Sequence, residues 1–204
     1  MKDEKILLSE DFKRCVEFHG HICPGLAIGF RAARILMERL NACRAVDEEL
    51  LAIVESDACG DDAIQVMTGC TFGKGNLIFR NYGKHAFTLV DRKGGRALRV
   101  SYRPTIFKAD PEYLALSDQV QTDEASPMQL ERFRQLRVER AKKILGAESE
   151  VLFKIEEISP DIPPKAVIVE SGTCNFCGEL TKMDLLRQFN GKRICIPCEQ
   201  RQGV

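Results

Sequence analysis

The sequence predicts a mixed helix and sheet domain followed by a small zinc-ribbon domain. Two observations indicate this division: apolar residues recur with helical and with strand spacing through residues 1–157, and four cysteines in two CxxC pairs occupy residues 167–204. The proline-rich stretch 158–166 has the composition of a stiff linker. A chain of 204 residues is too short for two full-sized cores, so the second domain is expected to be an appendage.

The first helices are predicted by capping residues and apolar spacing. Ser9 is a candidate cap for a helix that carries Phe12 and Cys15, and Pro24 suits the start of a longer helix over residues 26–40. A glycine-broken loop, residues 18–25, lies between them. The polar side chains of the longer helix are expected on its solvent face, and these are Arg31, Arg34, Glu38 and Arg39.

Short strands and two further helices complete the first domain. Apolar runs predict strands over residues 50–55, 77–79, 85–90, 97–102 and 151–155. The Gly94-Gly95 pair predicts a tight turn between the third and fourth of these strands. A short helix is expected around residues 63–67, and Ser126, Pro127 and Gly146 mark the cap, first position and stop of a long one.

The composition is that of a soluble globular protein. Apolar residues make up 44% of the chain and 30 basic side chains balance 30 acidic ones, which excludes a disordered, highly charged chain. No apolar run approaches the roughly 18 residues of a membrane helix, and the polar start lacks the apolar core of a signal peptide. We therefore expect a cytoplasmic protein that does not contact a membrane. The zero net charge does not favour a large nucleic-acid interface.

Cysteine is unusually abundant, with nine residues and no secretion signal. Disulfides rarely persist in reducing cytoplasm, and an odd number fits poorly with a fully paired framework. The thiols are therefore expected to bind metal, to react, or to pack as small buried side chains. Packing is the interpretation for Cys15 and Cys43, both expected on helices, and a structural role is expected for His85.

The clearest motif is a four-cysteine zinc site near the end of the chain. The pairs Cys174/Cys177 and Cys195/Cys198 are separated by 17 residues, a spacing typical of structural zinc. A redox dithiol or four free thiols are the alternatives. A structural or protein-contact role is expected for the ribbon; nucleic-acid binding is a weaker alternative, for which the basic residues are Lys182, Arg187, Lys192 and Arg193.

A second constellation lies near the start of the chain. His19, His21 and Cys23 fall within five residues on the glycine-broken loop, and imidazole and thiolate are the ligands that a zinc-like ion prefers. Cys23 precedes a helix, whose positive end favours a thiolate. The alternative is polar packing without a ligand.

Two further loops carry reactive side chains, and we expect all three loops to form one pocket. The loop 57–62 contains Cys59 and Asp62, and the loop 69–76 contains Cys70 and three glycines. Cys59, Cys70 and Asp62 are the candidate catalytic residues. Because glycines let backbone N–H groups approach an anionic ligand, the candidate cofactor-binding residues are Gly73, Lys74 and Asn76. The spacing of this loop is not that of a Walker A motif.

Three motifs together resemble the FmdE family, which is named after a subunit of formylmethanofuran dehydrogenase. They are His19-Gly20-His21-x-Cys23-Pro24-Gly25, Cys59-x-x-Asp62-Ala63-Ile64-Gln65 and Gly69-Cys70-Thr71-x-Gly73-Lys74-Gly75-Asn76. The resemblance covers about residues 12–155. It implies an α+β domain, often dimeric, with a metal pocket at the positions of His19, His21, Cys23 and Cys59, and with Cys70 nearby. The ribbon is similar to an appendage of some members.

Two functional hypotheses follow. The first is an FmdE-like metalloprotein linked to molybdenum or tungsten formylmethanofuran dehydrogenase-type or other one-carbon redox metabolism. It would hold a transition metal, zinc being expected, through His21, Cys23 and Cys59, with His19 as a ligand or hydrogen-bonded to one, and with Asp61 or Asp62 orienting a histidine. A homodimer and a protein partner in a redox complex are expected. The alternative is a non-enzymatic regulator or adaptor whose zinc ribbon contacts nucleic acid or a partner protein.

Overall fold

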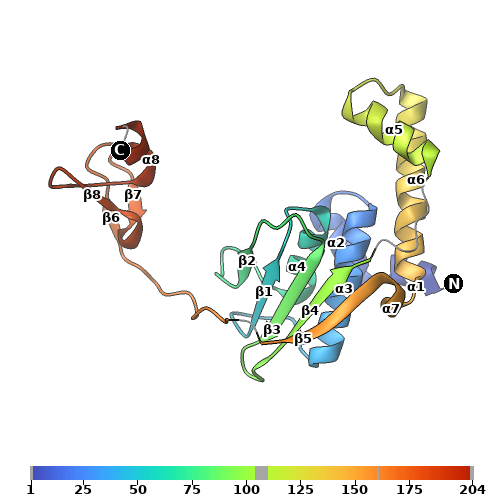
Figure 1. Cartoon of the computed structure of the whole chain (residues 1–204), viewed down its shortest axis with the longest axis horizontal. Helices are drawn as coiled ribbons and strands as arrows, with labels where there is room; N and C mark the ends of the chain where they lie inside the picture. Colours follow the sequence, from blue (N-terminus) through green and yellow to red (C-terminus); the bar gives the residue numbers. More distant parts are fainter. Residues whose placement is uncertain (1, 104–109, 160, 203–204) are drawn as a thin grey trace. The chain divides into compact units, whose positions relative to one another are not determined.

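The computed structural model describes residues 2–103, 110–159 and 161–202. The chain divides into two compact units, residues 1–165 and 166–204, and each is described by itself. Helices and strands are mixed in the first unit, as the sequence predicts (Figure 1).

A five-stranded mixed sheet forms the centre of the first unit. Its order is β2-β1-β3-β4-β5, with β1 and β2 parallel and the other neighbours antiparallel. The strands are β1 (Leu50–Val54), β2 (Leu77–Phe79), β3 (Ala86–Asp91), β4 (Arg96–Tyr102) and β5 (Phe153–Ile158). The predicted hairpin is confirmed, and Gly95 takes the positive φ of 67° that its turn requires. The last strand begins two residues later than predicted, because α7 (Ser149–Leu152) precedes it.

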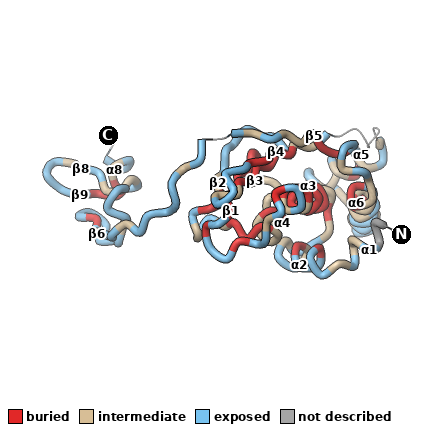
Figure 2. Tube along the Cα trace, turned by 90° about the horizontal axis from the view of Figure 1, so that it is seen from below, coloured by how far each residue is buried: buried red, intermediate tan, exposed pale blue. Residues whose placement is uncertain are grey.

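Two helices build the core against one face of this sheet. They are α3 (Pro24–Leu40) and α4 (Cys59–Thr68), and α2 (Glu10–His19) packs against both of them. Along β1 successive side chains alternate between faces, so Leu50, Ala52 and Val54 join the main apolar cluster while Leu51 joins a small one opposite. The tube coloured by burial is red along most of α3 (Figure 2).

The backbones of α3 and α4 touch at two glycines. A Cβ atom added to Gly29 would lie 2.1 Å from the backbone oxygen of Gly60. Only glycine permits this approach, which brings the first turns of the two helices together. Both turns carry candidate site residues, so the glycine contact positions the site.

A helical arm leaves this core. It consists of α6 (Pro127–Gly146), capped by Ser126 as predicted, and α5 (Pro111–Gln121), a helix that is not among those predicted from the sequence (Figure 1). Asp110 caps α5 and Pro111 occupies its first turn, a start signal that the sequence does carry. The chain begins with a further short helix, α1 (Lys2–Leu7), that contacts α6.

Arg31 anchors this arm, which corrects the prediction that it faces solvent. Its side chain is only 7% exposed and donates hydrogen bonds to the carbonyl oxygens of Ile144, Leu145 and Ala147 and to Ser149 Oγ. A cation at these last carbonyls of α6 also complements the helix dipole. The polar face of α3 is therefore interrupted at Arg31, where α6 covers it.

The second unit is a small ribbon of two hairpins. Its elements are β6 (Ser171–Thr173), β7 (Leu180–Lys182), a 3-10 turn η2 (Met183–Leu185), β8 (Arg187–Phe189), β9 (Lys192–Ile194) and α8 (Ile196–Arg201). Its buried apolar cluster contains only Ile194 and three cysteines, with Leu186 and Phe189 packed against them. This cluster is too small to stabilise a fold without a further cross-link.

Among the described helices, none combines the length and the apolar character that crossing a membrane requires.

Two candidate metal sites

The four ribbon cysteines converge on one point. Their sulfur atoms all lie within 4.8 Å of one another. Gly178, with a φ of 79°, closes the first CxxC turn, and the Cys195 N–H donates to Cys174 Sγ at 3.3 Å. Donation from the backbone N–H of Cys177, with those of Cys195 and Phe176, lowers the pKa of Cys174 to about 6 and so favours its thiolate. This cluster is the tetrathiolate arrangement expected of a structural metal site.

The N-terminal histidines and Cys23 also converge. α2 ends at His19, Gly20 turns the chain with a φ of 93°, and Cys23 caps α3. One ligand atom each from His19, His21 and Cys23 lie within 4.8 Å of one another. His19 Nε2 is 3.6 Å from Cys23 Sγ, so the imidazole and the thiol already face each other.

Asp62 orients His19. Its Oδ2 atom lies 2.7 Å from His19 Nδ1, which leaves His19 Nε2 directed at the cluster. Although burial lowers the pKa of His19, hydrogen bonds with Asp62 and Cys23 outweigh it and leave that pKa above its usual value. Asp62 comes from the first turn of α4, so one of the two expected aspartates does reach a histidine. A carboxylate behind an imidazole is a common support for metal-binding histidines.

Cys23 is held as a thiolate by its surroundings. A hydrogen bond from Cys59 lowers the pKa of Cys23, and burial opposes this, while the Leu26 N–H at 3.3 Å and His19 add to the lowering. The same contact raises the pKa of Cys59, which remains the thiol of the pair. A Cβ atom on Gly25 would lie 3.0 Å from Cys59 Cβ, so glycine there makes room for Cys59. Cys59 thus touches Cys23 but lies outside the group formed by His19, His21 and Cys23.

Arg137 of α6 reaches the same cluster. Its Nη2 atom is 2.7 Å from His21 Nε2, across 116 residues of sequence. Arg137 is not among the residues predicted for the site, because nothing in the spacing of α6 distinguishes it from the other arginines of that helix.

Comparisons with known proteins agree with the motifs. The family model described as "FmdE, Molybdenum formylmethanofuran dehydrogenase operon" matches residues 18–154. The chain belongs to the FmdE family. A solved structure of similar fold is an FmdE-like protein of tungsten formylmethanofuran dehydrogenase from Syntrophus aciditrophicus, with a TM-score of 0.61, 21% identity, and coverage of 99% of this chain and 94% of that one.

A curated relative is longer. It is a probable S-adenosyl-L-methionine-binding protein of Archaeoglobus fulgidus, 35% identical over 192 residues that make up 91% of this chain. The match covers 51% of the relative, so this FmdE chain spans about half the length of that protein.

The third FmdE motif does not join the metal cluster, which corrects the expectation of one pocket made by three loops. Cys59 begins α4 and Cys70 follows its end, and the ten residues of the helix separate the two ends by about 14 Å. Cys70 is fully buried, and that burial raises the pKa of its thiol. It therefore belongs to the core rather than to the site.

The polar residues of this loop hold protein backbone. Asn76 is fully buried, accepts from the Thr71 N–H, and donates to the carbonyl oxygens of Asp47 and Leu50. Lys74 donates to two carbonyl groups of the loop before β1, while Gly73 is exposed. The amide of Asn76 is thus already used within the fold.

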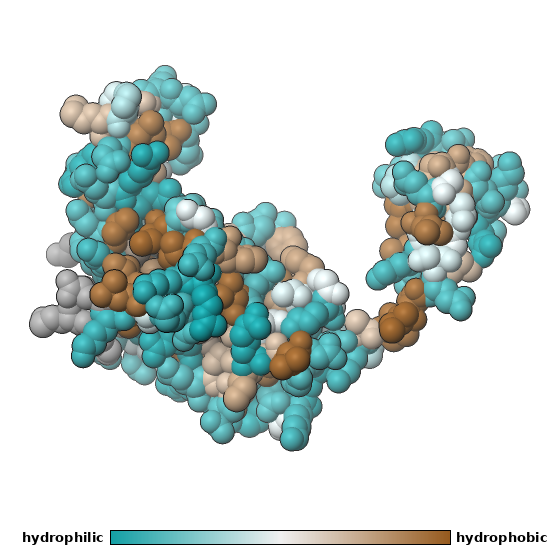
Figure 3. All heavy atoms as spheres, turned by 180° about the vertical axis from the view of Figure 1, so that it is seen from behind, coloured by the Kyte–Doolittle hydropathy of each residue, from teal (hydrophilic) through white to brown (hydrophobic). Residues whose placement is uncertain are grey.

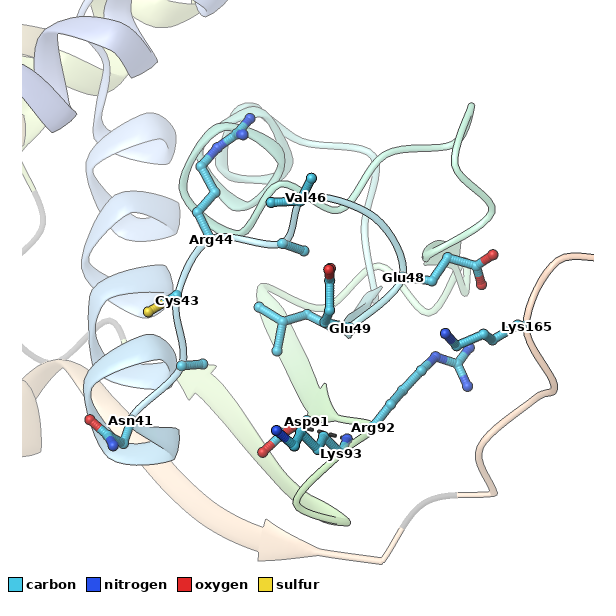
Figure 4. A pocket seen from close by; sticks show the side chains of 13 residues that line it. Asn41, Cys43, Arg44, Val46, Glu48, Glu49, Asp91, Arg92, Lys93 and Lys165 are labelled. Carbon is cyan, nitrogen blue, oxygen red and sulfur yellow. Dashed lines mark hydrogen bonds between the residues drawn. The ribbon is translucent and has the colours of Figure 1, made fainter.

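The remaining predicted residues lie away from the cluster. Cys15 is fully buried, as expected, whereas Cys43 follows the end of α3 and is exposed, which corrects its assignment to a helix. His85 is exposed just before β3. A cavity of about 630 Å³ lies beside Cys43, between the loop that leads into β1, the turn after β3, and Lys165, and it contains none of the predicted site residues (Figure 4).

Proposed function

We propose that this FmdE-family protein is a metalloprotein that holds a zinc ion at His19, His21 and Cys23 and a second, structural zinc ion at the four ribbon cysteines. The observation that carries the first site is the convergence of three ligand atoms within 4.8 Å, with His19 braced by Asp62. Two imidazoles and one thiolate suit zinc, a borderline-soft ion.

The two sites differ in what they offer chemically. Four thiolates close the coordination of a zinc ion, whereas three protein ligands leave a position open. A zinc ion there would polarise a bound water or carbonyl group. In the protein, Asp62 fixes the His19 ring, the Leu26 N–H stabilises the Cys23 thiolate, and Cys59 donates to that thiolate from beside the ligand group.

We place this activity in one-carbon redox metabolism linked to molybdenum or tungsten formylmethanofuran dehydrogenase-type enzymes, with a protein of such a complex as partner. The family match supports this setting. The S-adenosylmethionine binding in the name of the archaeal relative is not part of the proposal, because this chain covers about half of that protein.

Metal counting tests the proposal. The purified wild-type chain is expected to hold two zinc ions per chain by plasma mass spectrometry. The double variant His21→Ala/Cys23→Ala is expected to hold one, and Cys43→Ala, which removes a remote exposed thiol, should still hold two. If the double variant retains as much zinc as the wild type, the N-terminal site does not exist.

A second candidate is an adaptor in which the ribbon contacts another protein. Large apolar side chains are exposed on this small unit, where Leu180 is 77% and Leu185 43% exposed, and Figure 3 shows brown atoms on its surface. Basic residues are exposed there too, among them Lys182, Arg187, Lys192 and Arg193, so nucleic acid is the other occupant to test. Salt-dependent binding to DNA or RNA that is lost with residues 166–204 would favour nucleic acid. Salt-insensitive capture of a partner protein would favour the adaptor.

The homodimer implied by the family is also part of the proposal. The tip of the arm offers a surface for it, since Leu114 is 60% and Met128 80% exposed and Figure 3 shows apolar atoms there. Light scattering of the full chain should give twice the mass of 23.0 kDa. The variant Met128→Glu should lower that mass, and a monomeric wild type would contradict the dimer.

A further inference from the structure

Arg137 differs from the other arginines of α6 in what it contacts. Arg132 pairs with Glu112 at 2.7 Å, Arg134 with Glu131 at 3.5 Å, and Arg140 with Asp110 at 3.5 Å. Within the described part of the chain, the ion pairs include no carboxylate for Arg137, and its hydrogen-bond partner is the His21 ring. One guanidinium of the arm is therefore directed at the N-terminal cluster without a negative charge to balance it.

The contact defines the state of His21. A guanidinium stays protonated and has no acceptor, so Arg137 is the donor and His21 Nε2 is the unprotonated nitrogen. That lone pair is also the one His21 has available for a metal ion. Arg137 and a metal ion therefore compete for the same atom, and metal binding at Nε2 releases the guanidinium.

The released guanidinium remains beside the cluster. Its Cζ atom lies 5.7 Å from the centre of the Phe133 ring, one turn earlier on α6, and this cation–π contact does not involve His21. The arm itself is fixed to α3 by the buried Arg31. Arg137 is thus free to donate to something else without leaving the site.

The charges of the cluster favour an anion as that ligand. A divalent ion on two neutral imidazoles and one thiolate keeps a charge of about +1, and Arg137 adds another positive charge. Asp62, the carboxylate that contacts the cluster, is occupied by His19. A guanidinium fork binds carboxylate or phosphate oxygens in pairs, which a lone water does not satisfy.

We propose that Arg137 makes the N-terminal site a receptor for a small oxyanion, a carboxylate or a phosphate group, bound between the guanidinium and the open position of the metal. This inference rests on the metal site proposed above and assigns its ligand class. Arg137 is the specificity-determining residue, because it supplies the second positive charge. A neutral ligand of the same shape lacks the oxygens that both charges attract.

Titration of the zinc-loaded full chain with small ligands tests this, followed by NMR. Sodium acetate represents carboxylates, inorganic phosphate represents phosphate groups, and acetamide is the neutral match for acetate. Wild type should bind acetate or phosphate saturably and acetamide at least tenfold more weakly, since one charge-assisted bond commonly contributes a factor of about 10 or more. Whichever oxyanion binds more tightly identifies the source.

Variants separate this role from a structural one. Arg137→Ala should weaken oxyanion binding about tenfold while keeping two zinc ions, and Arg137→Lys, which keeps the charge but not the fork, should be intermediate. Arg134→Ala, on the same helix, should bind as the wild type does.

Equal dissociation constants for wild type and Arg137→Ala at full zinc content would overturn the inference and leave the metal site standing. Failure of the two-zinc wild type to bind either oxyanion would overturn it as well. A wild type that holds one zinc ion per chain would instead overturn the metal site, and the inference with it, so the zinc count tells the two failures apart.

Discussion

The two candidate metal sites stand on opposite kinds of foundation. The ribbon has a buried cluster of one isoleucine and three cysteines, so the ligands are most of its core. The N-terminal ligands sit at the ends of α2 and α3, which are already packed through Phe12, Phe30 and Leu36 into a large apolar core. In the ribbon the metal stabilises the fold, whereas in the first unit the fold positions the metal site.

The difference extends to the ligands themselves. Four thiols form a symmetrical set that leaves nothing for a substrate, while two imidazoles and one thiol are each held by a different neighbour: Asp62, Arg137 and the Leu26 N–H. Asymmetric support of this kind is typical of sites that bind a further ligand. Four measurements can break or sharpen this contrast, and the one with the largest expected effect comes first.

Metal removal should separate the two units most clearly. Binding to a structural zinc site supplies roughly 10–16 kcal/mol, which far exceeds what the small ribbon core provides. A strong chelator, or Cys174→Ser, should therefore unfold residues 166–204 completely and leave the sheet domain folded. Amide NMR spectra of the full chain should show collapse of the ribbon signals alone. Ribbon signals that survive without metal would contradict the distinction.

Loss of the glycine contact should damage the first unit through packing rather than through metal. In Gly29→Ala the new Cβ would meet Gly60 backbone at 2.1 Å, so α3 and α4 must move apart. Overpacking of this kind costs about 2–3 kcal/mol of unfolding free energy. Urea unfolding should show this loss together with weaker N-terminal metal binding, since Cys23 and Asp62 start the two helices.

Gly73→Ala is the matched control, because nothing lies within 4 Å of a Cβ at that position. Its unfolding midpoint should equal that of the wild type. If Gly29→Ala also unfolds at the wild-type midpoint, the N-terminal site does not depend on the close approach of the helices.

What the sequence could predict follows the same boundary between local and distant relations. The ribbon ligands, the His19, His21 and Cys23 group, and the caps Ser9 and Ser126 depend on residues a few positions apart, so spacing was sufficient to find them. The family match over residues 18–154 confirms the resemblance that these motifs carry.

Relations across the fold were not accessible in this way. Arg31 has the periodicity of a solvent-facing residue, and only the placement of α6 buries it. Cys59 and Cys70 are eleven positions apart in motifs of one family, yet the helix between them places them at opposite ends. Arg137 meets His21 across 116 residues, where no local pattern reports contact.

Asp62→Asn should test the support of the N-terminal site without disturbing the fold. Asn has nearly the shape of Asp but removes the charge that holds the His19 ring, and such partners commonly contribute about 10–100-fold to metal affinity. Competition with a zinc-sensitive dye should show this loss at the N-terminal site only. Asp57→Asn, an exposed residue just before α4, is the control, and an equal loss in both variants would contradict the role of Asp62.

The smallest expected effect is a gain. Because the Arg137 guanidinium occupies His21 Nε2 in the metal-free chain, Arg137→Ala removes a competitor and a nearby positive charge, and should tighten zinc binding at the N-terminal site. An exposed contact of this type is worth at most about 1 kcal/mol, so the gain should be up to about fivefold. The same dye competition at low oxyanion concentration measures it, with Arg134→Ala as reference. Weaker zinc binding by Arg137→Ala would mean that the arginine supports His21 as a ligand rather than competing for it.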